Sequence, residues 1–455
     1  MSPSSATRPV PSRRWTTAAI ACSIFVVALA SFRWELSSEP RFMDEAAFLS
    51  QSYFWDLAIS GRTNSPLWLE YPAYDLPPLP KYLIGASLQL HGIARTGRSW
   101  AIAWYRDPGE ARFVTAESLQ AARMPSLLLG ALGCVAIFAL GTLAVDRRVG
   151  LVAAGLLLVN PLYRLLSRRA MADVPAEALI LCTLALALVI WKGCLNGRTT
   201  TARAIILSIA VGVLSGLAVL AKLNGGLALM TVAAWAGLGV LWSLFRPSAV
   251  GSPLTEFQLS GGTFVAGLCA LSSFIVLNPF ITAGPTMSAG SPLMAPAPPN
   301  QSMTERLSHV VRHRVDVSRH GQTSFPRDAL RTTREKGKAL LVQGFGRFGP
   351  FGPSHADSTR RYDWTQDRGA LIWFPCVLAG LLWALVRGIR QTRAGEAPTS
   401  WALALQFLVS LLTVGMFLPL AWDRYFLPIQ SSSALLVAGA SVSTFDRIRK
   451  RAGYG

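Results

Sequence analysis

Charged residues are scarce in this sequence. Only 15% of its 455 residues are Asp, Glu, Lys or Arg, whereas 51% are hydrophobic. A soluble globular protein carries roughly a quarter charged residues. The charges that are present are clustered, and they leave apolar stretches close to the roughly 20 residues that span a bilayer. The composition therefore excludes an ordinary soluble protein and predicts a polytopic membrane protein.

Patterned cysteines are also absent. Five of the six cysteines lie inside apolar stretches, and no pair has the Cys-x-x-Cys spacing. The sequence therefore signals neither a disulfide framework nor a zinc site of cysteines. It indicates no cofactor. His309 and His313, four residues apart with His320 nearby, leave a divalent metal open as an alternative to solvated loop histidines.

A nucleic-acid-binding motif is missing too, although the formal net charge is +19. No stretch combines basic and aromatic residues in a recognition motif. Many Lys and Arg residues instead lie in short loops between apolar stretches, where membrane orientation places them. We therefore expect membrane lipids, and not nucleic acid, as a partner.

Ten apolar stretches predict an all-α fold of membrane-spanning helices. We place them at residues 17–32, 123–145, 149–166, 173–191, 203–221, 225–244, 260–280, 371–388, 401–420 and 425–443. Residues 80–93 are an alternative span, but Lys81 and Gln89 interrupt this short stretch, which favours a helix at the membrane surface. The first stretch follows three arginines and resembles a signal peptide, although the many later spans favour an uncleaved anchor.

The basic residues predict the orientation of these spans. With the N-terminus in the cytoplasm, every even-numbered gap and the C-terminal tail are basic, as the positive-inside rule requires. Two long segments, residues 33–122 and 281–370, then lie on the extracytoplasmic side. We expect a transmembrane module at 1–280 that includes the first outer segment, a large outer segment at 281–370, and C-terminal spans with a basic tail at 371–455.

Some basic residues break this charge rule. They lie at outer ends of spans, where the rule disfavours them: Arg123, Arg168, Arg169, Lys222 and Arg424. Charges there are costly and commonly functional, although snorkelling to lipid headgroups explains any single one equally well. Carboxylates share this face: Asp44, Glu45, Asp75, Asp173 and Asp423. Cations and carboxylates gathered together predict an anion-binding site with a general base.

Several short motifs resemble a known superfamily. Asp44-Glu45 after the first span, followed by Asp-Leu-Pro-Pro-Leu-Pro-Lys-Tyr at 75–82, resembles the first outer loop of protein O-mannosyltransferases and lipid A aminoarabinose transferases. Arg123-Met-Pro-Ser is similar to their Arg-x-x-Ser, residues 150–173 resemble their next segment, and residues 423–428 resemble their late Arg-Tyr-x-x-Pro. Leu76 stands where the mannosyltransferase loop has a His, so mannose and a protein acceptor do not follow.

The resemblance implies a C-type (GT-C) glycosyltransferase that uses a polyprenyl-phosphate sugar donor and a hydroxyl acceptor on a protein, lipid or glycan. Asp44 would be the catalytic base, and Glu45 would orient a neighbouring Arg or the acceptor. The five cations at the span ends would bind the donor phosphate. Other site candidates are Asp75, Lys81, Asp173, Asp423 and Tyr425.

The expected chemistry also fits these residues directly. A glycosidase needs a second carboxyl group to protonate its leaving group. A polyprenyl phosphate leaves as a stabilised anion, so one base and neutralising cations suffice, and the anomeric centre should invert. At a span end, we expect Arg123→Met to fold normally. The rival interpretations are a transporter or lipid flippase, and an inactive homologue that acts as a subunit.

Overall fold

The computed structural model describes residues 13–107, 110–245, 253–282, 295–298, 300–326, 328–346 and 368–453. Within these ranges the chain is helical, apart from loops and one isolated bridge between Ala329 and Leu420. Among the described residues, nine single helices are long and apolar enough to cross a membrane, and one bent pair makes a tenth if it is a single span, in agreement with the ten predicted spans. They are α1 (Arg13–Arg33), α7 (Ala116–Ala144), α8 (Arg147–Val159) with α9 (Pro161–Ser167), α10 (Asp173–Leu195), α11 (Thr201–Ala221), α12 (Leu227–Leu244), α13 (Pro253–Val276), α17 (Ala370–Arg393), α18 (Thr399–Phe417) and α19 (Leu427–Arg451).

Small residues bring neighbouring spans into close contact. Gly212 and Gly216 lie one turn apart on α11 and face Ala266 and Ala270 of α13. A Cβ atom on Gly212 would lie only 2.5 Å from the carbonyl oxygen of Ala266. Lipid tails are as apolar as the helix surfaces, so spans associate through this kind of close backbone packing. The Gly-x-x-x-Gly pair therefore fixes the distance between α11 and α13.

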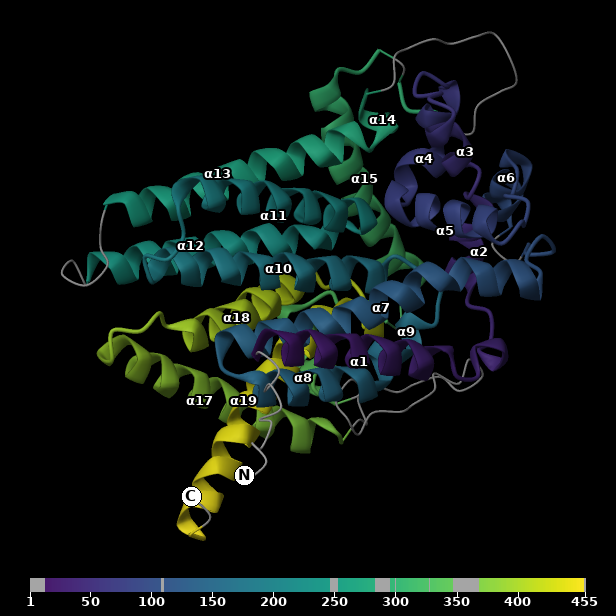
Figure 1. Cartoon of the computed structure of the whole chain (residues 1–455). Helices are drawn as coiled ribbons and strands as arrows, with labels where there is room; N and C mark the ends of the chain where they lie inside the picture. Colours follow the sequence, from purple (N-terminus) through teal and green to yellow (C-terminus); the bar gives the residue numbers. More distant parts are fainter. Residues whose placement is uncertain are drawn as a thin grey trace, which may run out of the picture.

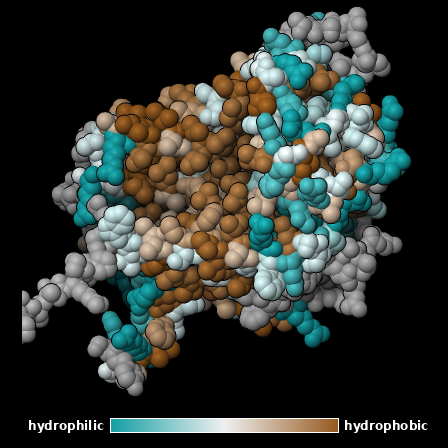
Figure 2. Space-filling view, turned by 45° about the vertical axis from the view of Figure 1, so that its right-hand side comes forward, coloured by the Kyte–Doolittle hydropathy of each residue, from teal (hydrophilic) through white to brown (hydrophobic). Residues whose placement is uncertain are grey.

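A band of apolar side chains covers the face of the bundle seen in Figure 2. Figure 2 shows it as a broad brown zone bordered by hydrophilic surface on both sides. Large apolar residues of the spans are exposed, including Ile206, Phe264, Leu382 and Leu412. A soluble protein rarely exposes so much contiguous apolar surface. The band is the surface expected of a multi-pass membrane protein.

One end of the bundle carries the short helices of residues 33–107. These are η1 (Leu36–Ser38), α2 (Met43–Ser50), α3 (Phe54–Ile59), η2 (Pro66–Leu69), α4 (Tyr71–Asp75), α5 (Pro78–Leu90) and α6 (Arg98–Arg106). Helices α14 (Pro279–Thr282) and α15 (Met303–Ser324) join α2–α6 at this end, whereas α1 begins and α19 ends toward the other (Figure 1). Helix α5 corresponds to the predicted non-spanning helix at 80–93. Helix α16 (Thr333–Val342) packs against α17 and α18, and the short helices η3 (Leu223–Gly226) and η5 (Asp423–Phe426) precede α12 and α19.

The span predicted at 149–166 is broken in the structure. Helices α8 and α9 meet at an angle of 68° at Asn160. Pro161 causes the break, because the residue before a proline is disfavoured in the helical conformation. The Asn160 side chain caps α9 by accepting the backbone N–H of Tyr163 at 3.0 Å, and it donates to Gln430 of α19 at 3.2 Å. The bend directs the segment that follows α9, with Arg168 and Arg169, toward η1.

Candidate active site

The adjacent carboxylates Asp44 and Glu45 occupy the first turn of α2. A helix N-terminus favours acidic residues because its unpaired N–H groups carry partial positive charge. Glu45 accepts the backbone N–H of Phe42 at 2.9 Å and thereby caps the helix. Successive helical residues point about 100° apart. The two neighbours therefore face different surroundings, and each forms an ion pair with a different arginine.

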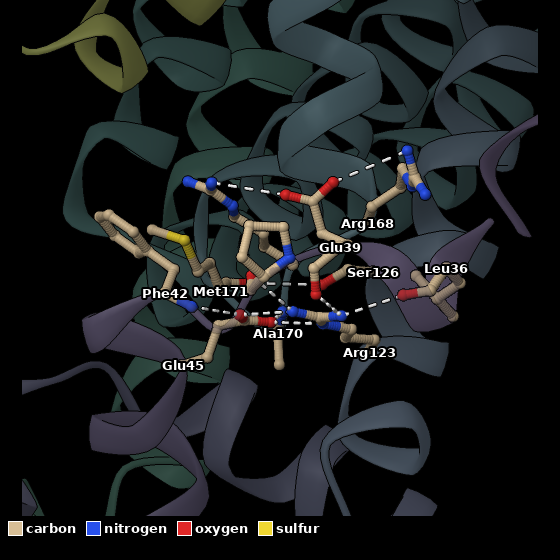
Figure 3. A network of polar contacts seen from close by, with 11 residues as sticks. Leu36, Glu39, Phe42, Glu45, Arg123, Ser126, Arg168, Ala170 and Met171 are labelled. Carbon is tan, nitrogen blue, oxygen red and sulfur yellow. Dashed lines mark hydrogen bonds and ion pairs between the residues drawn. The ribbon is translucent and has the colours of Figure 1, made fainter. Parts of the chain in front are cut away.

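Glu45 is completely buried in a network with Arg123 of α7 (Figure 3). Its two carboxylate oxygens accept Nε–H and Nη2–H of Arg123 at 2.8 and 2.9 Å. The backbone N–H of Ala170 donates to Glu45 at 2.8 Å. The remaining donors of Arg123 reach three backbone carbonyls, those of Leu36, Glu39 and Pro40. This network holds η1, α2, α7 and the segment after α9 together.

These contacts argue against the expectation that Arg123 tolerates an apolar replacement. Its side chain is only 1% exposed, and all of its hydrogen-bonding nitrogens are already in use. Removing one partner of a buried ion pair costs about 3–5 kcal/mol, because the other charge stays buried and unpaired. The geometry thus favours a structural role for Arg123 over direct binding of a phosphate.

Arg168 and Arg169 lie on either side of Glu39. Their guanidinium groups approach the Glu39 carboxylate at 3.6 and 3.5 Å (Figure 3). Arg168 also donates to the carbonyl of Glu35, and Arg169 packs over the ring of Phe42 at 4.5 Å. Among the described residues, the Nε–H group of each arginine lacks an acceptor. Two cations thus share one carboxylate, and each keeps a donor for a further anion.

A second ion pair joins Asp44 to Arg424, 380 residues further along the chain. Arg424 belongs to the short helix η5 (Asp423–Phe426) that precedes α19. The side chain of Asp44 is 31% exposed and that of Arg424 is 20% exposed. The guanidinium carbon lies 4.7 Å from the ring centre of Trp422 and 5.9 Å from that of Tyr425. This pair is therefore accessible, and aromatic rings orient its cation.

Lys222 and Asp173 adjoin this pair through Tyr425. The Lys222 ammonium lies 2.6 Å from a carboxylate oxygen of Asp173 and 5.4 Å from the ring centre of Tyr425. Lys222 follows the last residue of α11, and Asp173 is the first residue of α10. Residues from four distant parts of the sequence thus form one partly exposed cluster, which we call the Asp44 cluster: Asp44, Asp173, Lys222, Arg424 and Tyr425.

Asp75 and Lys81 form a separate cluster under α15. Asp75 accepts the Tyr105 hydroxyl at 2.6 Å, and His313 and Arg314 approach it at 3.1 and 3.7 Å. Burial alone would raise the pKa of Asp75, but His313, Arg314 and Tyr105 together hold it below its usual value. Asp75 therefore fastens α15 to α4 and α6.

Lys81 is fully buried beside this cluster. It donates to the carbonyls of Pro72 and Ala73 at 2.5 and 3.3 Å. Burial lowers the pKa of Lys81 well below its usual value, although the charge of Asp75 opposes the shift. Its position inside the first outer segment favours a structural role.

Asp423 accepts the backbone N–H of Arg424 at 2.9 Å and so shapes the turn that presents Arg424.

The histidines considered as metal ligands have other neighbours. His309 packs edge-on against Tyr74, and His313 bonds to Asp75. Over the described ranges, no three His, Cys, Asp or Glu side chains are grouped as metal ligands. Glu39, Trp422 and Tyr105 were not among the predicted site residues. Glu39 carried a signal, because it is an acidic residue between the first span and Asp44, whereas Trp422 and Tyr105 gain their roles only through the fold.

The described residues thus form a multi-pass helical membrane protein with a cluster of ion pairs at one end of its spans. Residues 51–280, just over half of the chain, match the family described as dolichyl-phosphate-mannose-protein mannosyltransferase. The chain belongs to this family. Membership in this family favours an enzyme over the transporter or lipid flippase that the sequence left as an alternative.

Solved structures of an archaeal oligosaccharyltransferase agree with this fold. The chain resembles the oligosaccharyltransferase of Archaeoglobus fulgidus with a TM-score of 0.53 and 15% identity, over 97% of this chain and 52% of that one. It thus spans about half the length of that protein. The yeast (S. cerevisiae) protein O-mannosyltransferase Pmt1–Pmt2 matches at 17% identity, over 60% and 34% of the two chains, with a TM-score of 0.41. ArnT from Cupriavidus metallidurans matches at 14% identity, over 94% and 59%, with a TM-score of 0.44. No curated protein sequence matches the chain.

Proposed function

We propose that this protein transfers a sugar from a polyprenyl-phosphate donor to a hydroxyl group of a protein, lipid or glycan acceptor. One observation carries the proposal: a partly exposed carboxylate, Asp44, lies in contact with a partly exposed arginine, Arg424, with Lys222 and Asp173 beside them. The family description supports a lipid-phosphate donor. Because Leu76 stands where the family has a His, we propose the class of donor and not a particular sugar.

The proposed reaction uses Asp44 as the general base. Asp44 takes the proton of the acceptor hydroxyl, and the acceptor oxygen attacks the anomeric carbon as the bond to the phosphate oxygen breaks. Attack from the face opposite the phosphate inverts the anomeric centre. A planar guanidinium binds a phosphate through paired hydrogen bonds, and an ammonium adds a point charge. Arg424 and Lys222 supply these groups, and Arg168 and Arg169 supply further positive charge around Glu39.

We also propose that the site lies on the extracytoplasmic side and that both termini lie in the cytoplasm. Basic residues in the short loops opposite the Asp44 cluster support this orientation. The bond between His313 and Asp75, and that between the Tyr74 hydroxyl and the carbonyl of Ala295 at 2.9 Å, support one cap built by segments 33–122 and 281–370. A topology reporter fused after Val149 should be cytoplasmic, and one fused after Gln301 should be extracytoplasmic. The reverse result would refute the orientation.

The direct experiment is an assay of the purified protein in lipid nanodiscs. The protein is incubated with a panel of polyprenyl-phosphate sugars and hydroxyl acceptors, and the released polyprenyl phosphate is measured. We expect release with at least one donor, and its loss in Asp44→Asn. Donor consumption that continues unchanged in Asp44→Asn would contradict the assignment of the base. A well-folded protein that consumes no donor would favour the inactive homologue.

A further inference from the structure

Arg424 has a counter-ion in the resting structure that the proposed reaction would remove. Its guanidinium contacts the carboxylate of Asp44, the group to which we assign the acceptor proton. A carboxylate that gains a proton loses its charge and with it most of its attraction for an arginine. Transfer of the proton therefore changes the partner that Arg424 prefers.

The leaving group changes in the opposite direction. A polyprenyl-phosphate sugar is a phosphodiester with one negative charge. When the bond between the anomeric carbon and the phosphate oxygen breaks, its electron pair stays on that oxygen and yields a phosphate monoester. A monoester carries about −1.5 to −2 charges at neutral pH. One negative charge thus disappears from Asp44 while one appears on the phosphate.

We propose that Arg424 exchanges partners during transfer, from the carboxylate of Asp44 to the departing phosphate. This inference rests on the proposed function and adds a link between its base and its leaving group. Proton uptake by Asp44 would release the cation that the phosphate needs, and the charges balance at each stage. The carboxylate of Asp44 would in turn compete with the lipid phosphate for Arg424 when no sugar is being transferred.

The surroundings of Arg424 suit such an exchange. Its side chain is 20% exposed, and Trp422 and Tyr425 hold the guanidinium by ring contacts that need no counter-ion. The buried pair of Glu45 and Arg123 has no comparable freedom, because both side chains are at most 1% exposed. Asp173 is only 4% exposed and keeps Lys222 as its partner. Among the three pairs, that of Arg424 is the most accessible.

Asp44→Asn tests the exchange without requiring turnover. Asparagine imitates the uncharged carboxyl group after proton transfer and removes the carboxylate that contacts Arg424. Each variant in nanodiscs is titrated with undecaprenyl phosphate, which carries the monoester but no sugar, and the bound fraction is measured by native mass spectrometry. Removing the competing charge should tighten binding about tenfold, equivalent to one charge interaction of about 1.4 kcal/mol. The matched control is Asp316→Asn, which removes an exposed carboxylate outside the site and should leave the affinity unchanged.

The second variant is Arg424→Gln, made alone and together with Asp44→Asn. If Arg424 receives the phosphate, Asp44→Asn should no longer tighten binding once Arg424 is replaced. If Arg424→Gln does not fold, Arg424→Lys, which keeps the charge, replaces it. The comparison of wild type with Asp44→Asn then tests the exchange by itself. Binding that is equal or weaker in Asp44→Asn, in a protein that still binds undecaprenyl phosphate, overturns the exchange alone. No binding by any folded variant overturns the proposed function as well.

Discussion

Two ion pairs begin at adjacent residues of α2, and their surroundings differ completely. Glu45 pairs with Arg123 inside the protein, where backbone groups satisfy both partners. Asp44 pairs with Arg424 at an accessible position beside aromatic rings. A fully satisfied buried pair fixes structure, whereas a partly exposed pair can change its partners or its protonation. Within a single helical turn, we therefore assign a structural role to Glu45 and propose the catalytic role for Asp44.

The largest expected effect is the loss of catalysis in Asp44→Asn. Asparagine keeps the size of the side chain but cannot accept the acceptor proton. Loss of a general base should lower the turnover rate about 10²–10⁴-fold. The melting temperature should stay close to that of the wild type, because Asp44 is partly exposed. Initial rates and thermal unfolding of the same preparation measure both quantities, and a large fall in stability would place Asp44 with Glu45.

Arg123→Met should damage folding more than chemistry. It leaves Glu45 buried without its cation, which should destabilise the protein by about 3–5 kcal/mol. The double variant Glu45→Gln with Arg123→Met removes both charges and should recover part of that loss. Thermal unfolding in nanodiscs of the two single variants and the double variant measures this coupling. Additive losses would show that the two residues do not act as a pair.

The attachment of α15 through Asp75 should weaken in acid. The folded state lowers the pKa of Asp75, so the unfolded state binds the proton more readily at a given pH. The stabilisation is therefore complete above the usual Asp pKa of about 4, and it is lost as the pH falls below that value. In the wild type, the protection of α15 amides against hydrogen exchange should therefore fall in that pH range. In Asp75→Asn, hydrogen exchange of α15 should be faster than in the wild type at neutral pH and should vary less with pH. If the variant kept the acid response of the wild type, another group would be responsible for that response.

The smallest expected effect concerns the ring beside Arg424. Trp422→Leu removes one cation–π contact but keeps an apolar side chain. Such contacts are worth about 0.5–1 kcal/mol at exposed positions, so donor binding should weaken about two- to fivefold. Equilibrium binding of the donor to wild type and variant tests this, with Trp401→Leu at the opposite end of the spans as the control. An effect as large as that of Arg424→Gln would give Trp422 a direct contact with the donor.

Much of the fold could be predicted from sequence, because span length and loop charge are local properties. The bend at Asn160 also had a local signal in Pro161, although the sequence interpretation drew α8 and α9 as one span. The identity of ion-pair partners was not local. Nothing near Arg123 in sequence indicates that Glu45 and three backbone carbonyls will surround it, so a structural arginine and a ligand-binding arginine look alike.

The same limit applies to the candidate site. Charge at span ends marked basic residues that the structure pairs with carboxylates at one end of the bundle, but their predicted roles stay predictions. It did not separate the Asp44 cluster from the Asp75 cluster, because that division depends on how α4, α6 and α15 pack. Burial, which only the structure supplies, distinguishes Asp44 from Glu45.

The most direct test of the account compares Asp44→Asn with Glu45→Gln as turnover per folded molecule. Sugar transfer is measured for both variants in nanodiscs, and each rate is divided by the fraction of protein that remains folded. We predict that Asp44→Asn stays folded and loses about 10²–10⁴-fold in rate, whereas Glu45→Gln loses mainly folded protein. Near-normal turnover in Asp44→Asn, with transfer abolished in well-folded Glu45→Gln, would contradict the account and exchange the two roles.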